Sequence, residues 1–257
     1  MDFAVSAGLA SSFEFVPETG STNTDLIAKS AQLSDFSVKV AGFQNAGRGR
    51  SGRQWLAPAG SSLFVSVLLK PQNVPASKFS WLPLLAGLAM NRAVSDLIAP
   101  ARSSLKWPND VLVGEQKISG VLSELVPDLS GVVIGAGLNV SQEQGDLPIE
   151  SATSLRLQGA HTLEHDQVLA RYLGHLKDLY QRFVANQGDA VASGLRFSVI
   201  DECGTINRRV KAIMPGDTEV LGEAVGIDDS GRLILLRGDS GQVFPVAAGD
   251  IVHLRHN

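Results

Sequence analysis

The stretch Gly47-Arg-Gly-Arg-Ser-Gly-Arg-Gln-Trp55 stands between two strand-like segments, residues 36–43 and 62–69, and the rest of the chain is organised around it. Its glycines permit positive φ angles and a close approach of the backbone to a ligand, and its three arginines are permanently charged. No Gly-Lys-Ser/Thr follows, so this is not a Walker A loop, and the glycine spacing of a dinucleotide-binding loop is missing too. We expect a loop that closes over an anion, although these residues alone also fit a mobile cationic surface turn.

Length and composition limit the class of protein. The chain has 257 residues, 44% of them apolar, which is enough for one large domain with or without a small companion. No apolar run approaches the roughly twenty residues of a membrane-spanning helix. The N-terminus has no basic region ahead of an apolar segment, so we expect no secretory signal and a cytoplasmic protein without membrane partners. With a net charge of −4, nucleic-acid binding through bulk positive charge is not expected.

Cysteine and histidine do not indicate a protein-bound metal. The single cysteine, Cys203, cannot form an internal disulfide and is interpreted as a small packed residue. His161, His165 and His175 lie on or near a predicted helix without a carboxylate motif of metal-ligand spacing. They are interpreted as surface histidines.

Apolar periodicity predicts a mixed sheet with helices. Helical spacing of apolar residues predicts helices over 81–98 and 165–186, and a shorter helix is expected within 189–200. Besides the two strands that flank the arginine/glycine loop, strands are expected at 13–16, 111–113, 117–126 and 131–140.

From about Gly204 the pattern changes to short strands separated by regular turns. These strands are expected at 209–213, 219–226, 232–236, 242–246 and 251–255, which is typical of a small barrel. We therefore place one domain over residues 1–203 and a second over residues 204–257.

Three further segments combine residue types suited to a ligand site. Ser21-Thr22-Asn23 precedes an apolar run, so these residues either only begin a helix or also bind the polar head of a small ligand. Segment 105–111 combines lysine, tryptophan, proline, asparagine and aspartate, a mixture that packing alone does not require. Gly135 and Gly137 weaken a strand unless a ligand or another backbone lies close, which favours a ligand wall.

Taken in order, four blocks of the sequence resemble the biotin–protein ligases. The blocks are Gln44 with Gly47–Trp55, Lys106–Asp110, Lys117–Glu124 and Gly135–Val140. Residues 248–254 also resemble the C-terminal module of that family, so the likeness covers nearly the whole chain. Each block alone is weakly specific, whereas the ordered set is highly specific.

The resemblance implies an α+β fold similar to class II synthetases, with a mixed sheet and helices, followed by an SH3-like barrel. It implies a ligase that joins biotin and ATP, with ATP-bound Mg²⁺, into biotinyl-5′-AMP and pyrophosphate. A lysine of the biotin carboxyl carrier domain of a biotin-dependent carboxylase then takes the biotinyl group. Some family members begin with a DNA-binding domain; because only 20 residues precede Ser21 here, we expect none.

The resemblance also implies candidate site residues. Those for biotin are Ser21, Thr22, Asn23, Gln44, Gly47, Arg48, Gly49, Lys117, Gly120, Gly135 and Gly137. Those for ATP and the adenylate are Arg48, Arg50, Arg53, Trp55, Lys106, Asn109, Lys117 and Asn139, with Trp107 as a second aromatic platform. The candidate catalytic residues are Lys117, Arg48, Arg50 and Asp110.

The chemistry of these residue types suits the implied reaction. Joining a carboxylate to the α-phosphate of ATP gathers negative charge, so the main task is to neutralise charge and align the attack. Arginines can clamp the phosphates, and Lys117 is the cation expected at the carboxylate and α-phosphate. Asp110 is the candidate that orients the acceptor amine or accepts its proton, and a closed loop would keep water from the adenylate.

Two other functions stay open at this point. A lipoate–protein ligase or octanoyltransferase resembles this family in fold and also modifies a carrier lysine. A non-catalytic RNA-binding module could use the arginine/glycine run and the small barrel, although the acidic balance opposes it.

Overall fold

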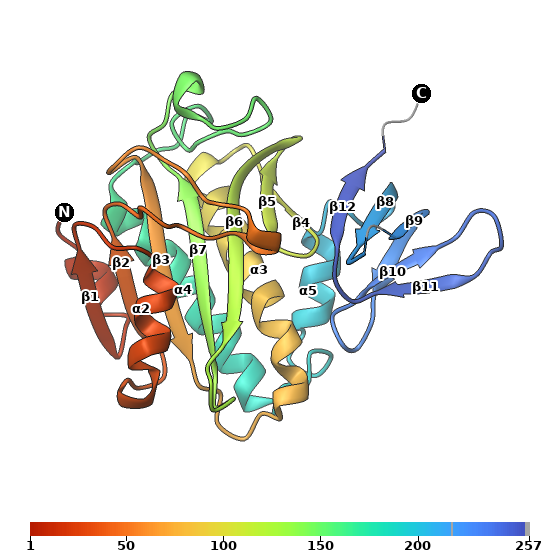
Figure 1. Ribbon diagram of the computed structural model, residues 1–257, viewed down its shortest axis with the longest axis horizontal. Coiled ribbons are helices and arrows are strands. Elements are labelled where there is room, and N and C mark those ends of the chain that lie inside the picture. Colours follow the sequence, from red (N-terminus) through yellow and green to blue (C-terminus); the bar gives the residue numbers. More distant parts are fainter. Residues whose placement is uncertain (217, 255–257) are drawn as a thin grey trace.

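The computed structural model describes residues 1–216 and 218–254, and it contains two β-sheets formed by successive parts of the chain (Figure 1). The larger sheet has seven strands in the order β1-β2-β3-β7-β6-β5-β4, of which only β1 and β2 run parallel to each other. These strands are β1 (Ser12–Val16), β2 (Ser37–Ala41), β3 (Ser62–Leu69), β4 (Ser104–Lys106), β5 (Asp110–Val113), β6 (Gln116–Leu125) and β7 (Val132–Asn139).

The two faces of this sheet are covered differently. Helices α3 (Leu82–Ile98) and α4 (His165–Ala185) lie behind the sheet in Figure 1, and α2 (Thr22–Lys29) lies in front of it. Along β3, Val65 and Val67 belong to the main core with α3 and α4, whereas Leu68 packs with Leu26 of α2 in a separate small cluster. Because side chains alternate along a strand, Ser66 shares the α2 face with Leu68. Burial on both faces explains the nearly unbroken apolar sequence of β3.

The two long predicted helices are confirmed as α3 and α4, and the strand expectations hold with small shifts at the ends. The helix expected within 189–200 begins later, since α5 spans Leu195–Glu202 and follows Gly194, whose φ of 74° places it in the left-handed region. Two short elements were not expected, α1 (Ala4–Ala7) and β4, because four and three residues show no period.

The second sheet confirms the short strands expected after Gly204. It is antiparallel throughout, in the order β11-β10-β9-β8-β12. Its strands are β8 (Arg209–Met214), β9 (Thr218–Ile227), β10 (Leu233–Leu236), β11 (Val243–Val246) and β12 (Asp250–His253). The expectation that the last strand extends to residue 255 falls partly outside the described residues.

Two indoles tie the sheets together. Trp81 Nε1 donates to the carbonyl oxygen of Asp229 at 2.9 Å, and Trp107 Nε1 donates to that of Gly231 at 3.1 Å. Trp107 is only 3% exposed, so the expectation that it forms a platform for the adenylate was wrong. A buried indole N–H needs an acceptor, and Trp107 finds it in the turn before β10 instead of in a ligand.

Cys203 is buried as predicted, and burial raises the pKa of its thiol. His165 differs from the expectation of a surface residue, because it is half-buried and burial lowers its pKa. In the described part of the chain, no helix is long and apolar enough to cross a membrane.

Candidate active site

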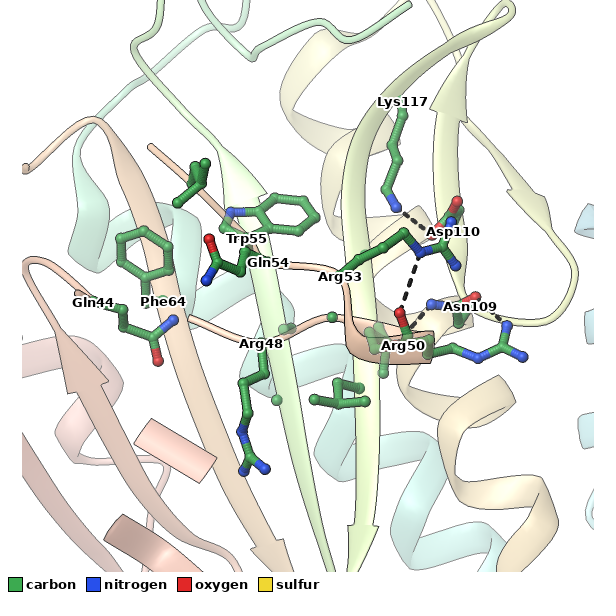
Figure 2. A pocket seen from close by; sticks show the side chains of 18 of the residues that line it. Gln44, Arg48, Arg50, Arg53, Gln54, Trp55, Phe64, Asn109, Asp110 and Lys117 are labelled. Carbon is green, nitrogen blue, oxygen red and sulfur yellow. Dashed lines mark hydrogen bonds and ion pairs between the residues drawn. The ribbon is translucent and has the colours of Figure 1, made fainter. Parts of the chain in front are cut away.

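A cavity of about 620 Å³ opens on the α2 face of the large sheet (Figure 2). Its floor comes from β3, β7 and β6, one end from the start of α2, and its cover from the arginine/glycine loop. The volume is in the range of small-molecule sites. Of the candidate site residues, all but Gly47 and Trp107 line this cavity; Gly47 belongs to the loop and lines the smaller hollow beside the cavity.

One end of the cavity, called the neutral end below, presents the uncharged groups of Thr22, Asn23 and Gln44, and the Arg48–Glu124 ion pair lies next to Asn23. Gln44 Oε1 accepts from the backbone N–H of Thr22 at 2.8 Å and from its hydroxyl at 3.0 Å. Ser66 Oγ lies 2.7 Å from Thr22 Oγ1 and 2.6 Å from Asn23 Oδ1. The Ser21 side chain, although buried at the N-cap position, makes no capping hydrogen bond. This end therefore offers fixed donors and acceptors to an uncharged polar group.

In the middle of the cavity, the wall is formed by glycines of β6 and β7, which have no side chains. A Cβ atom on Gly137 would lie 2.6 Å from the Trp55 ring, and one on Gly120 would lie 3.0 Å from it. A Cβ on Gly135 would overlap the Asn23 carboxamide. These three glycines are needed because Trp55 and Asn23 lie directly on the strands, as Figure 2 shows for Trp55.

The opposite end of the cavity is charged. Lys117 Nζ lies 2.6 Å from Asp110 Oδ1 and 5.5 Å from the centroid of the Trp55 ring. Lys117 stands on β6 and Asp110 begins β5, so the pairing of these two strands brings the ammonium and the carboxylate together. Lys106 and Asn109 line the same end. The cation needed for phosphate chemistry is thus present next to a possible proton acceptor.

The three arginines of the loop are held by two parts of the molecule, Arg48 by α2 and β6, and Arg50 and Arg53 by residues at the start of β12. Arg48 donates to Glu124 at 2.9 Å and to Thr24 Oγ1 at 3.0 Å. Arg50 donates to Asn109 Oδ1 at 2.9 Å and to the carbonyl oxygen of Gly249 at 3.2 Å. The sequence predicts a joint clamp on phosphates, whereas in this structure the Arg48 side chain points away from those of Arg50 and Arg53 (Figure 2).

The remaining arginine, Arg53, donates to Asp250 of β12 at 2.8 Å. The loop therefore contacts both sheets. Ser51, with φ of 55°, and Gly52, with φ of 72°, form the turn at its tip. Burial lowers the pKa of Arg50 below its ordinary value, and Asp250 and Asp110 oppose that shift; a guanidinium stays protonated at neutral pH.

Sequence reasoning missed several residues of the site. Glu124 accepts from Asn23 Nδ2 at 2.8 Å as well as from Arg48, so one carboxylate oxygen joins α2 to the loop. Ser66 was missed because a serine in an apolar strand carries no signal of its own. Leu56, Pro148 and Ile149 also line the cavity, and their segments show no regular period.

Comparison with known proteins agrees with this geometry. Residues 13–139 match the biotin/lipoate A/B protein ligase family, and residues 205–254 match the biotin protein ligase C-terminal domain. The chain is 40% identical to a biotin–[acetyl-CoA-carboxylase] ligase of Mycobacterium tuberculosis, over 94% of this chain and 89% of that protein. A ligase of the same name from Paracoccus denitrificans is 32% identical, over 89% of this chain and 96% of the relative.

Solved structures give the same result. The chain resembles the biotin protein ligase of Aquifex aeolicus in complex with biotin and ATP, with a TM-score of 0.77 and 27% identity, over 95% of this chain and 99% of the other. Both sheets are included in a match of this extent. The chain therefore belongs to the biotin protein ligase family.

Proposed function

We propose that this protein activates biotin with ATP and transfers the biotinyl group to a lysine of a biotin carboxyl carrier domain. The observation that carries the proposal is the polarity of one cavity: neutral hydrogen-bonding groups at Thr22 and Gln44, and the charged pair of Lys117 and Asp110 at the other end. Biotin has the same polarity, with an uncharged ureido ring at one end and a carboxylate at the other. Between the two ends, the Trp55 ring lies on the glycines of β6 and β7, and this apolar surface suits the apolar chain of biotin.

In the first step, an oxygen of the biotin carboxylate attacks the α-phosphorus of ATP and pyrophosphate leaves. We assign Lys117 to the carboxylate and the α-phosphate, where its charge would stabilise the negative charge of the transition state. Arg48, Arg50 and Arg53 would exchange their present partners for phosphate oxygens when the nucleotide enters. Trp55, Lys106, Asn109 and Asn139 would contact the nucleotide from the cavity wall.

ATP is proposed to bind as its Mg²⁺ complex. Asp110 is the only carboxylate among the described residues that line the cavity, and it is paired with Lys117. One engaged carboxylate fits a metal that arrives already held by phosphate oxygens, and not a metal site formed by protein side chains. The metal would supply charge neutralisation on the departing pyrophosphate.

In the second step, the amine of the acceptor lysine attacks the biotinyl carbonyl carbon, an amide forms, and AMP leaves. The amine must lose a proton, and we assign Asp110 to orient or accept it. Lys117 would then stabilise the leaving AMP. The arginine/glycine loop, which covers the cavity, would keep water from the anhydride between the two steps.

The Asp110→Asn variant tests the second assignment. Loss of a general base is expected to slow transfer from preformed adenylate by about two to four orders of magnitude. Single-turnover transfer to a carrier domain measures this rate, with Asp96→Asn, a surface residue paired with His175, as the control. Transfer by Asp110→Asn at the wild-type rate would remove Asp110 from the mechanism.

The Arg50→Ala variant tests the loop as a cover. Arg50 bonds to Asn109 and Gly249 in this structure, and in the adenylate complex we assign it to a phosphate oxygen instead; one charge-assisted hydrogen bond of this kind contributes about 1.5–3 kcal/mol. The adenylate should therefore dissociate or hydrolyse about ten- to a hundredfold faster. Arg182→Ala, an exposed arginine of α4, is the control, and an unaltered off-rate for Arg50→Ala would contradict the closed-loop proposal.

We further propose that the chain divides after Cys203 into a catalytic domain over 1–203 and an SH3-like domain over 204–257. We also propose that the protein is located in the cytoplasm, together with the carboxylase.

The function is tested by mixing the protein with ATP, Mg²⁺, a carrier domain and one of three acids, biotin, lipoate or octanoate, and then measuring the mass of the carrier. An increase by one biotinyl group supports the proposal. An increase with lipoate or octanoate in its place would identify the related lipoate or octanoate ligase activity.

A further inference from the structure

Four residues that lie side by side on neighbouring strands of the large sheet form a row beneath α2, and none of them has an apolar side chain. Glu14 of β1 pairs with Lys39 of β2, Lys39 pairs with Ser66 of β3, and Ser66 pairs with Gly135 of β7. Lys39 is only 4% exposed. A sheet surface beneath a helix is normally apolar, and a buried ammonium is costly unless it is paired, so this row calls for a physical explanation.

Three members of the row contact the first turn of α2. Lys39 Nζ lies 3.2 Å from Asp25 Oδ2. Ser66 contacts Thr22 and Asn23, and Gly135 leaves the space that Asn23 occupies. The first turn of α2, which lines the neutral end of the cavity, is thus held on the sheet by polar contacts. Such contacts are directional, so they restrict the movement of the helix along the sheet.

The carboxylate of Asp25 extends this arrangement to Gln44. Its Oδ2 also accepts from Thr19 Oγ1 at 2.7 Å. The backbone of Thr19 bonds on either side of Gln44: its N–H donates to the carbonyl oxygen of Phe43 at 3.1 Å, and its carbonyl oxygen accepts from Asn45 N at 3.1 Å. A continuous path therefore runs from Lys39 through Asp25 and Thr19 to the segment that presents Gln44.

We propose that Lys39 is a positioning residue for the uncharged head group of the substrate. It holds Asp25 and, through Asp25 and Thr19, fixes the spacing between Thr22 and Gln44, whose side chains would bind the ureido group. The inference rests on the proposed function. Lys39 touches no substrate: Glu14, 3.1 Å from its ammonium, and Asp25 enclose it from two sides.

The first turn of α2 is held rigidly because any movement away from the sheet would separate Lys39 from Asp25 at a large cost in free energy. If the first turn of α2 moved away, Lys39 would lose one of two carboxylates in a place shielded from water. A displacement of a binding group by about 1 Å can cost about a hundredfold in rate or affinity. Removing the charge should therefore loosen the neutral end of the cavity and leave the charged end intact.

The Lys39→Met variant tests this, since methionine keeps an unbranched stem and removes the charge. We expect the Kd for biotin, measured by calorimetry without ATP, to rise about ten- to a hundredfold, with the KM for ATP changed by less than about twofold. Lys29→Met is the matched control, because Lys29 pairs with Glu14 at 3.4 Å from an exposed position and, among the described residues, its ammonium forms no ion pair with Asp25. It should bind biotin as the wild type does.

Thr19→Val is the second variant, and it carries the test if Lys39→Met does not fold. It removes only the hydroxyl that joins Thr19 to Asp25, and biotin binding should weaken about two- to tenfold with an unchanged KM for ATP. A lower melting temperature of a folded Lys39→Met with wild-type biotin affinity would overturn the inference, as would wild-type affinity in Thr19→Val. Wild-type protein that fails to bind biotin would instead contradict the proposed function.

Discussion

Lys117→Ala is expected to slow formation of the biotinyl adenylate by at least about two orders of magnitude, a typical loss for one charge-stabilising group. The ammonium of Lys117 lies at the charged end of the cavity, 2.6 Å from the carboxylate of Asp110. Its removal would leave the transition state of the first step without the cation assigned to it. Biotin-dependent exchange of labelled pyrophosphate into ATP measures this step alone.

Lys211→Ala is the matched control for this experiment. The side chain of Lys211 is 31% exposed, the same fraction as that of Lys117, and it pairs with Glu219 at 2.8 Å on the second sheet. Both variants lose one lysine from a partly exposed ion pair, so the loss of stability should be similar and small. Exchange near the wild-type rate in Lys117→Ala would remove Lys117 from the mechanism.

Gly135→Ala is expected to weaken biotin binding strongly while the protein stays folded. The added Cβ would overlap the Asn23 carboxamide, so Asn23 must move and give up its contact with Ser66. Inserting a methyl group into a packed site costs about 1–3 kcal/mol, which corresponds to about five- to 150-fold in affinity. Calorimetric titration with biotin measures the change.

Gly226→Ala provides the control for the added methyl group. Gly226 is also a strand glycine, but no atom lies within 4 Å of the position its Cβ would take. Its biotin affinity should equal that of the wild type. If Gly135→Ala also bound biotin normally, the neutral end of the cavity would not be the head-group site.

The sequence predicts most of the fold because its strongest signals are local. The apolar stripe of α4 and the nearly unbroken apolar run of β3 each specify an element without reference to the rest of the chain. Short elements such as β4 escape this reasoning, since three residues carry no period. Trp107 was assigned incorrectly because a tryptophan beside polar residues suits a ligand site and a buried junction between two sheets equally well.

The sequence by itself determined which residue types the protein has for its chemistry: a cationic loop, a lysine, an aspartate and glycines in strands, in the order of the family. Only the tertiary structure decided which of these groups face each other. Lys39 and Ser66 look like ordinary strand residues until strand pairing sets them in one row under α2. The physical reason is that periodicity is a property of neighbouring residues, whereas strand register and helix docking join residues far apart in the chain.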